Sequence, residues 1–309
     1  MLPWLTSVLA GGHLAFVIAA GSLRWEHAVA DLLLVALTWA PLRTQAYARA
    51  GLALWLTGIL LDNQPYFIDA LRGNVHTGDL WSLEARLFPA WVDGVQSVWA
   101  AHFMRYPSTL LDAVCGFAYA IYLPQFFGIL VALFALKSPR AERMAWTFFV
   151  VNALGVLVYI LYPAAPPWYV MTHGPGPADL AARGNAAGAA RFDALLGIRF
   201  FEGFYARNPN PFGAMPSLHT AYPTAALWQV WHRGVRWQLP AALFALLIGF
   251  SAVYLSHHYI LDVLAGAAVA GIACAAVDGT VRARTKNGAA LGSVGAPVAV
   301  LTGEGSRHD

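Results

Sequence analysis

The sequence predicts an all-α fold, a polytopic transmembrane bundle of about six to eight membrane helices. Of its 309 residues, 59% are hydrophobic and only 11% are charged, whereas a soluble domain is about 25% charged. Several apolar runs approach the ~20 residues that span a bilayer. The 12 tryptophans suit the aromatic belts of membrane interfaces. A net charge of +3 is too small to indicate nucleic-acid binding.

Eight apolar segments account for this bundle. In chain order they are residues 4–22, 27–42, 47–62, 108–136, 144–162, 216–232, 238–255 and 259–278. The second and third are short, so they either cross the membrane or form a re-entrant pair. The fourth is long, and we expect it to tilt or protrude. A signal peptide has basic residues before its apolar run. The first segment has none, so we expect an uncleaved membrane helix.

Basic residues gather in alternate connections between these segments. They are Arg43, Arg49, Lys137, Arg140, Arg143, Arg233, Arg236, Arg282, Arg284 and Lys286. The positive-inside rule makes these connections cytoplasmic. Both termini then lie inside, and the long loops 63–107 and 163–215 lie outside. The alanine- and glycine-rich composition favours a bacterial source, so we expect an integral protein of the inner (plasma) membrane.

The chain divides into four parts. Residues 1–62 hold the N-terminal membrane helices, and residues 108–278 form the core that carries the motifs described below. Residues 63–107 mix aromatic and charged side chains at roughly helical spacing, which predicts amphipathic helices in the extracytoplasmic interface. Residues 279–309 carry Gly, Ser and charge without periodicity, which predicts a disordered cytoplasmic tail. The Gly- and Ala-rich stretch 171–198 predicts a flexible cover.

The first polar motif is "GAMPSLHTAYP", residues 213–223. Pro216 suits the first turn of a helix, where its missing N–H is no loss. His219 then lies in the first turn, where free backbone N–H groups and the helix dipole favour an anion. Ser217 adds a hydroxyl donor. The motif therefore predicts a phosphate site on the extracytoplasmic side.

The second motif is "YLSHHYILD", residues 254–262. His258 and Asp262 are four residues apart and share one face of a helix. A carboxylate that accepts from one imidazole nitrogen leaves the other nitrogen as a nucleophile. His219 of the first motif can protonate a leaving alkoxide. Together these three side chains are sufficient for a covalent phosphotransfer.

Three other interpretations fit these residues. His258 and Asp262 can form a purely structural pair, or they can relay protons in a non-catalytic transporter. The apolar run after Asp262 offers no ionisable path for such a relay. The histidines and Asp262 can also bind zinc, but no His-x-x-x-His or Cys cluster supports a metal. Cys115 and Cys274 each lie within an apolar run and do not suggest a disulfide framework.

Both motifs resemble those of the type 2 phosphatidic acid phosphatase superfamily. "PSLH" is similar to the second motif of the superfamily, Pro-Ser-Gly-His, and "SAVYLSHHYILD" is similar to its third motif, Ser-Arg-x5-His-x3-Asp. The resemblance implies a phosphatase-like catalytic core in which His258 is the nucleophile. Asp262 is then its orienting carboxylate, and His219 is the acid for the leaving group.

The departures from the superfamily pattern are informative. The arginine of the third motif falls on Ala252, and the first motif, Lys-x6-Arg-Pro, has no match. The stretches "AMPSLH", "HHYILDVLAG", "YPAAPP" and "DALRGNVHTGDLWSLEARLF" resemble the inositol phosphorylceramide synthase branch instead. That resemblance implies transfer of phosphoinositol from phosphatidylinositol to a ceramide-like lipid through a phosphohistidine, without a cofactor. The alternative is a lipid phosphate phosphatase, which uses water as the acceptor. The missing arginines favour the transferase, because a phosphomonoester carries more charge than a diester.

Other cations must replace the missing arginines, because the developing phosphoryl charge needs compensation. Arg207, shortly before the first motif, is the first candidate, and His257, beside the nucleophile, is the second. Arg72 and His76 on the other outer loop are secondary candidates. The expected partners are lipid substrates and the membrane.

Overall fold

The computed structural model describes residues 2–41, 45–207 and 210–294, and it is an all-α membrane architecture. Five of the described helices are long and apolar enough to cross a membrane. They are α1 (Leu2–Ala19), α7 (Thr109–Ala135), α8 (Arg140–Leu161), α13 (Val235–Tyr254) and α14 (Ile260–Val294, apolar enough over Ile260–Arg284). Three further helices coincide with the remaining apolar segments. They are α2 (Trp25–Trp39), α3 (Gln45–Asp62) and α12 (Leu218–Val230).

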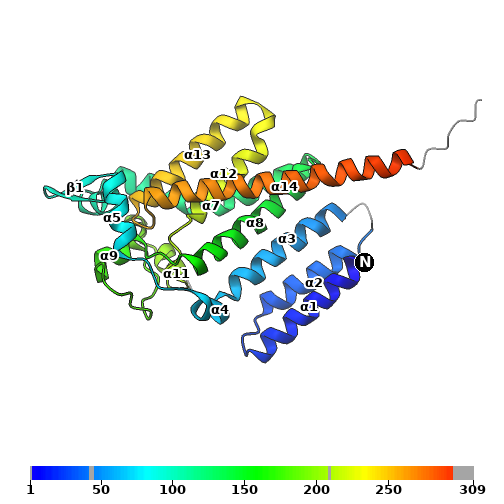
Figure 1. Ribbon diagram of the computed structural model, residues 1–309, viewed down its shortest axis with the longest axis horizontal. Helices are drawn as coiled ribbons and strands as arrows, with labels where there is room; N and C mark the ends of the chain where they lie inside the picture. Colours follow the sequence, from blue (N-terminus) through cyan, green and yellow to red (C-terminus); the bar gives the residue numbers. More distant parts are fainter. Residues whose placement is uncertain (1, 42–44, 208–209, 295–309) are drawn as a thin grey trace, which may run out of the picture.

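Each of the eight predicted segments is a helix. Consecutive membrane helices run in alternating directions (Figure 1). The beginning of α1 and the end of α14 lie at one end of the bundle, and the short elements of the two long loops gather at the other. The arrangement agrees with a topology in which both described ends share one side. α12 is shorter than predicted, because its last turn is the 3₁₀ helix η3 (Trp231–Arg233).

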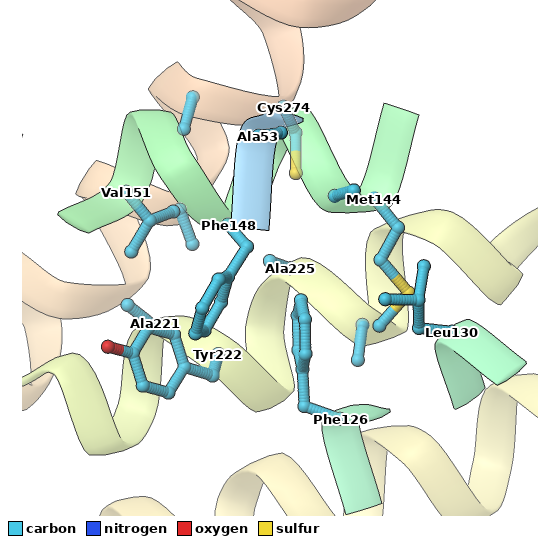
Figure 2. Close-up of a cluster of buried hydrophobic side chains, with 14 of the residues drawn as sticks. Ala53, Phe126, Leu130, Met144, Phe148, Val151, Ala221, Tyr222, Ala225 and Cys274 are labelled. Carbon is cyan, nitrogen blue, oxygen red and sulfur yellow. The ribbon is translucent and has the colours of Figure 1, made fainter. Parts of the chain in front are cut away.

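The centre of the bundle is α12, which packs against α7, α8, α13 and α14. Figure 2 shows the cluster at its middle, where the ring of Phe148 lies between Phe126 and Tyr222. The ring centroids are 4.9 Å and 4.8 Å apart. The Tyr222 hydroxyl donates to Asn152 Oδ1 at 2.7 Å, so its one polar atom in this apolar layer is satisfied. This packing fixes α12, and with it the first motif, relative to α8 and α14.

The N-terminal helices join the bundle through α3, which packs along α8 (Figure 1). The buried carboxylate of Asp31 in α2 ties the three helices together. It accepts from Trp55 Nε1 of α3 at 2.7 Å and lies 3.0 Å from His13 Nδ1 of α1. Because an unpaired carboxylate among membrane helices is costly, this pairing fixes their relative positions.

Residues 63–107 contain the expected short helices and one unexpected hairpin. The helices are α4 (Gln64–Leu71), α5 (Gly78–Leu87) and α6 (Trp99–Arg105), and the hairpin joins β1 (Ala90–Val92) to β2 (Val95–Ser97). Asp93 and Gly94 at its turn both have positive φ, 49° and 82°. An Asp-Gly pair between alternating apolar residues is the sequence signal for such a two-residue turn, and it was overlooked.

Within residues 163–215, the second half of the stretch 171–198, predicted as a flexible cover, is helical and in part packed against the bundle. This loop contains α9 (Pro167–His173), η2 (Ala187–Ala189), α10 (Ala190–Leu196) and α11 (Phe200–Tyr205). Phe192 is buried against Gly116 of α7, where a Cβ would overlap its ring. A Cβ added at Gly188 would lie 2.8 Å from the Cα of Leu255. Gly188, one of the small residues that suggested flexibility, is therefore a point of close approach to the bundle.

Two further predictions, the disordered tail 279–309 and the cytoplasmic Arg43, fall partly or wholly outside the described residues. α14 continues to Val294, so residues 279–294 are helical where disorder was predicted. Residues 279–294 contain alanine and no proline, and this composition is compatible with a continued helix. Residues 295–309, the rest of the predicted tail, and Arg43 lie outside the described residues.

Candidate active site

The two motifs meet at the end of the bundle that carries the short loop elements (Figure 1). His219 lies in the first turn of α12, and His258 lies in the connection from α13 to α14. His219 Nδ1 is 3.1 Å from His258 Nε2; His258 is buried and His219 is partly buried. The structure thus brings together two histidines that are 39 residues apart in the chain.

The other nitrogen of His258 is held by a backbone carbonyl. His258 Nδ1 lies 2.8 Å from the oxygen of Ala214 and 3.5 Å from Asp262 Oδ2. The nearer acceptor is therefore Ala214 in the first motif, whereas the sequence pointed to Asp262 alone. With Nδ1–H donated to a carbonyl, Nε2 carries the lone pair and is directed at His219.

The Asp262 side chain is fully buried, and its carboxylate contacts both a backbone N–H and the His258 imidazole. Its Oδ2 accepts from the N–H of Tyr259 at 2.8 Å, which caps the beginning of α14. The carboxylate remains close enough to stabilise positive charge on the His258 ring. Asp262 thus links the start of α14 to His258.

Ser217 is the N-cap of α12, so the helix begins after Pro216 and not at it. Its Oγ accepts from the N–H of Thr220 at 3.4 Å, and its own N–H donates to the Asp262 carbonyl oxygen at 2.9 Å. The side chain is fully buried and is not part of the cavity lining. Its predicted contact with phosphate stays a prediction.

Gly266 permits this junction of α12 with α14. An added Cβ would overlap the carbonyl oxygen of Ser217 and lie 3.1 Å from its carbonyl carbon. Only glycine allows the two helices to approach this closely. The sequence offered a weak signal, an isolated glycine one turn beyond Asp262.

Tyrosines enclose both histidine stretches, and sequence reasoning did not find them. The ring of Tyr119 stacks on His219 at 4.3 Å, and Tyr122 lies 4.7 Å from it on the same face of α7. Tyr205 of α11 stacks on His257 at 4.2 Å. Tyr119 and Tyr122 are three residues apart in α7 and therefore share one helical face, but nothing in the sequence pairs that face with the motifs.

His257 lies outside the cavity. Burial lowers its pKa to about 3, so the ring is neutral, and Nε2–H donates to the Ala186 carbonyl at 3.1 Å. A neutral imidazole supplies no positive charge for a phosphate. The residue instead holds the loop before α10 against the α13–α14 connection.

A cavity of about 810 Å³ opens beside the histidine pair. Its polar lining includes His219, His258, Gln64, Tyr122, Tyr159, Arg199, Tyr205, Arg207, Asn210 and Tyr222. The predicted cation Arg207 is present and makes no ion pair within the described residues. Arg199 was not predicted, and its guanidinium is bound to Glu202 at 2.7 Å and 2.6 Å. Arg207 is therefore the better-placed cation for an anionic substrate.

The secondary candidates do not line this cavity. Arg72 pairs with Asp69 at 3.0 Å and lies 5.0 Å over the ring of Phe212. His76 pairs with Asp79 and stacks on Tyr162 at 3.8 Å. In this structure both hold the outer loops together.

Glu84 of α5 supports the site from the outer loop, and sequence reasoning did not single it out. Its carboxylate accepts from the N–H groups of Ile260 and Leu261 at 2.8 Å and 3.1 Å, at the beginning of α14. Burial raises the pKa of Glu84 to about 7, although the two N–H bonds favour the ionised form. Glu84 therefore positions the segment that carries Asp262.

The described residues contain no group of three or more His, Cys, Asp or Glu side chains that could hold a metal ion. The described site contains a histidine pair, a buried carboxylate and a nearby arginine. A nucleophilic nitrogen and a second imidazole suited to acid–base transfer can together cleave and re-form a phosphate ester.

Residues 78–276 match the family model of the PAP2 superfamily. The chain belongs to this superfamily. The matched range includes His219, His258 and Asp262, and it confirms the resemblance that the two motifs carry. No solved structure gives a significant match to this PAP2 protein.

Curated relatives of this PAP2 protein include bacterial and fungal enzymes. It is 34% identical over 248 residues to the phosphoinositol dihydroceramide synthase of Bacteroides thetaiotaomicron, covering 79% of this chain and 81% of the relative. It is 27% identical over 272 residues to the inositol phosphorylceramide synthase catalytic subunit of Schizosaccharomyces pombe, covering 84% and 62%. The match to inositol phosphorylceramide synthase of Candida albicans is 33% over 160 residues and covers 51% and 34%. The chain therefore spans only part of the length of these fungal proteins.

Proposed function

We propose that this protein transfers the phosphoinositol head group of phosphatidylinositol to a ceramide-like lipid alcohol through a phosphohistidine on His258. The observation that carries the proposal is the 3.1 Å contact of His219 Nδ1 with His258 Nε2, together with the Ala214 carbonyl that holds the opposite nitrogen. The names of its relatives, which are phosphoinositol and inositol phosphorylceramide synthases, support the donor and the acceptor class.

In the first half-reaction, the donor phosphate lies between the two imidazole rings and replaces their mutual contact. His258 Nε2 attacks phosphorus, and the bond from phosphorus to the diacylglycerol oxygen breaks. His219 enters as the imidazolium, which the negative phosphodiester stabilises, and gives its proton to the departing oxygen. The phosphorylated His258 ring is positively charged, and the Asp262 carboxylate, 3.5 Å from Nδ1, stabilises that charge.

In the second half-reaction, the neutral His219 takes the hydroxyl proton of the acceptor lipid. The resulting alkoxide attacks phosphorus, and the bond from phosphorus to His258 Nε2 breaks. Both histidines then return to their initial protonation states. One imidazole therefore acts as acid and then as base, and no further proton donor is needed.

The lining of the cavity suits this donor. The guanidinium of Arg207 can bind the phosphate through charge-assisted hydrogen bonds. Gln64, Tyr122 and Tyr205 add uncharged polar groups, which match the hydroxyls of inositol. The positive-inside rule supports an extracytoplasmic site, since Lys137 and Arg143 lie at the opposite end of α7 and α8.

The proposal is tested with purified protein in detergent with a chelator present. Phosphatidylinositol and phosphatidic acid are each offered with and without ceramide or dihydroceramide, and the wild type is compared with His258→Ala. His232→Ala, remote from the site in η3, is the matched control. Release of diacylglycerol that depends on the acceptor, and that is lost only in His258→Ala, supports the transferase. Phosphate release from phosphatidic acid without an acceptor makes the protein a phosphatase, and turnover that survives His258→Ala removes the phosphohistidine.

A further inference from the structure

A second large cavity lies at the other end of the bundle from the histidines. Its volume is about 1000 Å³, and its walls come from α3, α8, α14 and the α7–α8 connection. Within α8, Arg143 lines this cavity and Tyr159 lines the catalytic one. The about 16 intervening residues span about 24 Å at 1.5 Å each, close to the ~30 Å of a bilayer core. The second cavity is therefore separate from the catalytic site and lies toward the opposite membrane face.

The charged lining of this cavity is predominantly positive. It comprises Arg49, Lys137, Glu142, Arg143 and Arg284. Glu142 accepts from Arg49 at 2.7 Å and 2.8 Å, and Asp278, outside the lining, accepts from Arg143 at 3.1 Å. The other two cations, in the α7–α8 connection and in α14, make no ion pair within the described residues. Two positive charges at this cavity are thus left without a carboxylate partner in the described chain.

The apolar lining continues from these cations toward the middle of the bundle. On α8, Trp146 and Val150 follow Arg143 at helical spacing, and on α14, Val277 precedes Arg284 by two turns. α8 therefore presents charge near its beginning and α14 near the end of its apolar span, with apolar side chains further in on both. Tyr47 also lines the cavity and stacks on Phe134 at 4.7 Å, as aromatic residues do at the headgroup level.

We infer that this cavity binds one membrane phospholipid with an anionic head group. Its phosphate meets Lys137 and Arg284, and an acyl chain lies along Trp146, Val150 and Val277. Basic pockets between membrane helices recognise anionic lipids in this way. A zwitterionic lipid would gain less from the two cations, and a soluble phosphate would gain nothing from the apolar wall. The inference does not depend on the proposed transferase activity.

The test titrates the purified full chain, in a neutral detergent, with phosphatidylglycerol and counts bound lipids by native mass spectrometry. Lys137→Gln combined with Arg284→Gln is compared with the matched control Arg236→Gln combined with Arg282→Gln. Both pairs remove the same charge from the same end of the bundle, but the control residues do not line the cavity. Arg282 is two residues from Arg284, so it lies on nearly the opposite side of α14.

We expect the wild type and the control pair to bind one phosphatidylglycerol equally, and the cavity pair to bind it about 30-fold more weakly. At about 1.4 kcal/mol per factor of ten, that loss corresponds to about 1 kcal/mol for each cation. Arg207→Gln, which removes the cation of the catalytic cavity, should bind like the wild type, which separates this site from the catalytic one. Equal weakening in both pairs, an unchanged affinity in the cavity pair, equally strong binding of phosphatidylcholine, or displacement by glycerol 3-phosphate would each overturn the inference.

Discussion

Gly266→Ala should disable the enzyme while leaving it folded. The added Cβ would overlap the Ser217 carbonyl oxygen, which is backbone and cannot rotate away. Because C···O contacts are normally about 3.3 Å or longer, the beginning of α12 must move from α14 by about 1 Å. The 3.1 Å contact of His219 with His258 spans that junction, so the two imidazoles lose their alignment.

The expected magnitude follows from the displacement. A misplacement of about 1 Å costs roughly a hundredfold in rate, whereas overpacking costs about 1–3 kcal/mol of stability. We expect kcat for phosphoinositol transfer to fall about 100-fold, with little change in KM. The assay measures kcat and KM on phosphatidylinositol and ceramide, with the melting temperature of the same preparation as a check on folding.

Gly271→Ala is the matched control for this prediction. It lies in the same helix, and an added Cβ there meets nothing within 4 Å. It should retain wild-type turnover and gain slightly in helix stability. Wild-type kcat in Gly266→Ala would refute the reasoning, because the close approach of the two helices would then not set the histidine geometry.

Three further outcomes test other parts of the structure. Arg207→Gln should raise KM for phosphatidylinositol roughly 10- to 100-fold, because a hydrogen bond to a charged group contributes about 1.5–3 kcal/mol, while Arg199→Gln should change it little; equal effects would contradict the assignment of the phosphate cation. Because the pKa of Glu84 is raised to about 7 from its ordinary 4.5, the folded chain holds its proton more tightly. The contribution of protonated Glu84 to stability should be complete below about pH 4.5 and should be lost, at about 3 kcal/mol, as pH rises through 7; the difference in thermal stability between the wild type and Glu84→Gln should follow this decline. Phe148→Ala should cost about 3–5 kcal/mol of stability by opening a cavity in the central cluster, measured as a fall in melting temperature, and the exposed Phe117→Ala should not.

The fold was largely predictable because long apolar runs predict membrane helices. Each of the eight apolar segments is a helix, since an exposed backbone is intolerable in a bilayer. The connections were less predictable. Gly188 and its alanine neighbours indicated flexibility by composition, but small residues also permit close packing, and only the partner Leu255 distinguishes the two cases. The hairpin at Asp93 and Gly94 carried a local signal that went unused.

The proximity of His219 and His258 was predictable, because each motif is a local pattern and both fall on one predicted membrane side. The supporting groups were not, because they act across long sequence separations. Tyr119 reaches His219 from another helix, and Glu84 reaches the start of α14 from the outer loop. The Ala214 carbonyl is a backbone group that any sequence contains. His257 was predicted as a cation for the phosphate from its residue type alone, but its burial makes the ring neutral.

The central claim is that His258 carries the phosphoryl group between donor and acceptor. The most direct measurement incubates the wild type with phosphatidylinositol labelled at phosphorus, without an acceptor, and examines the denatured protein for label. We expect label on His258 that is labile to acid and stable to base, that disappears when ceramide is added before denaturation, and that is absent from His258→Ala. An unlabelled wild-type protein that nevertheless transfers phosphoinositol to ceramide would contradict the account, because the head group would then pass directly from donor to acceptor.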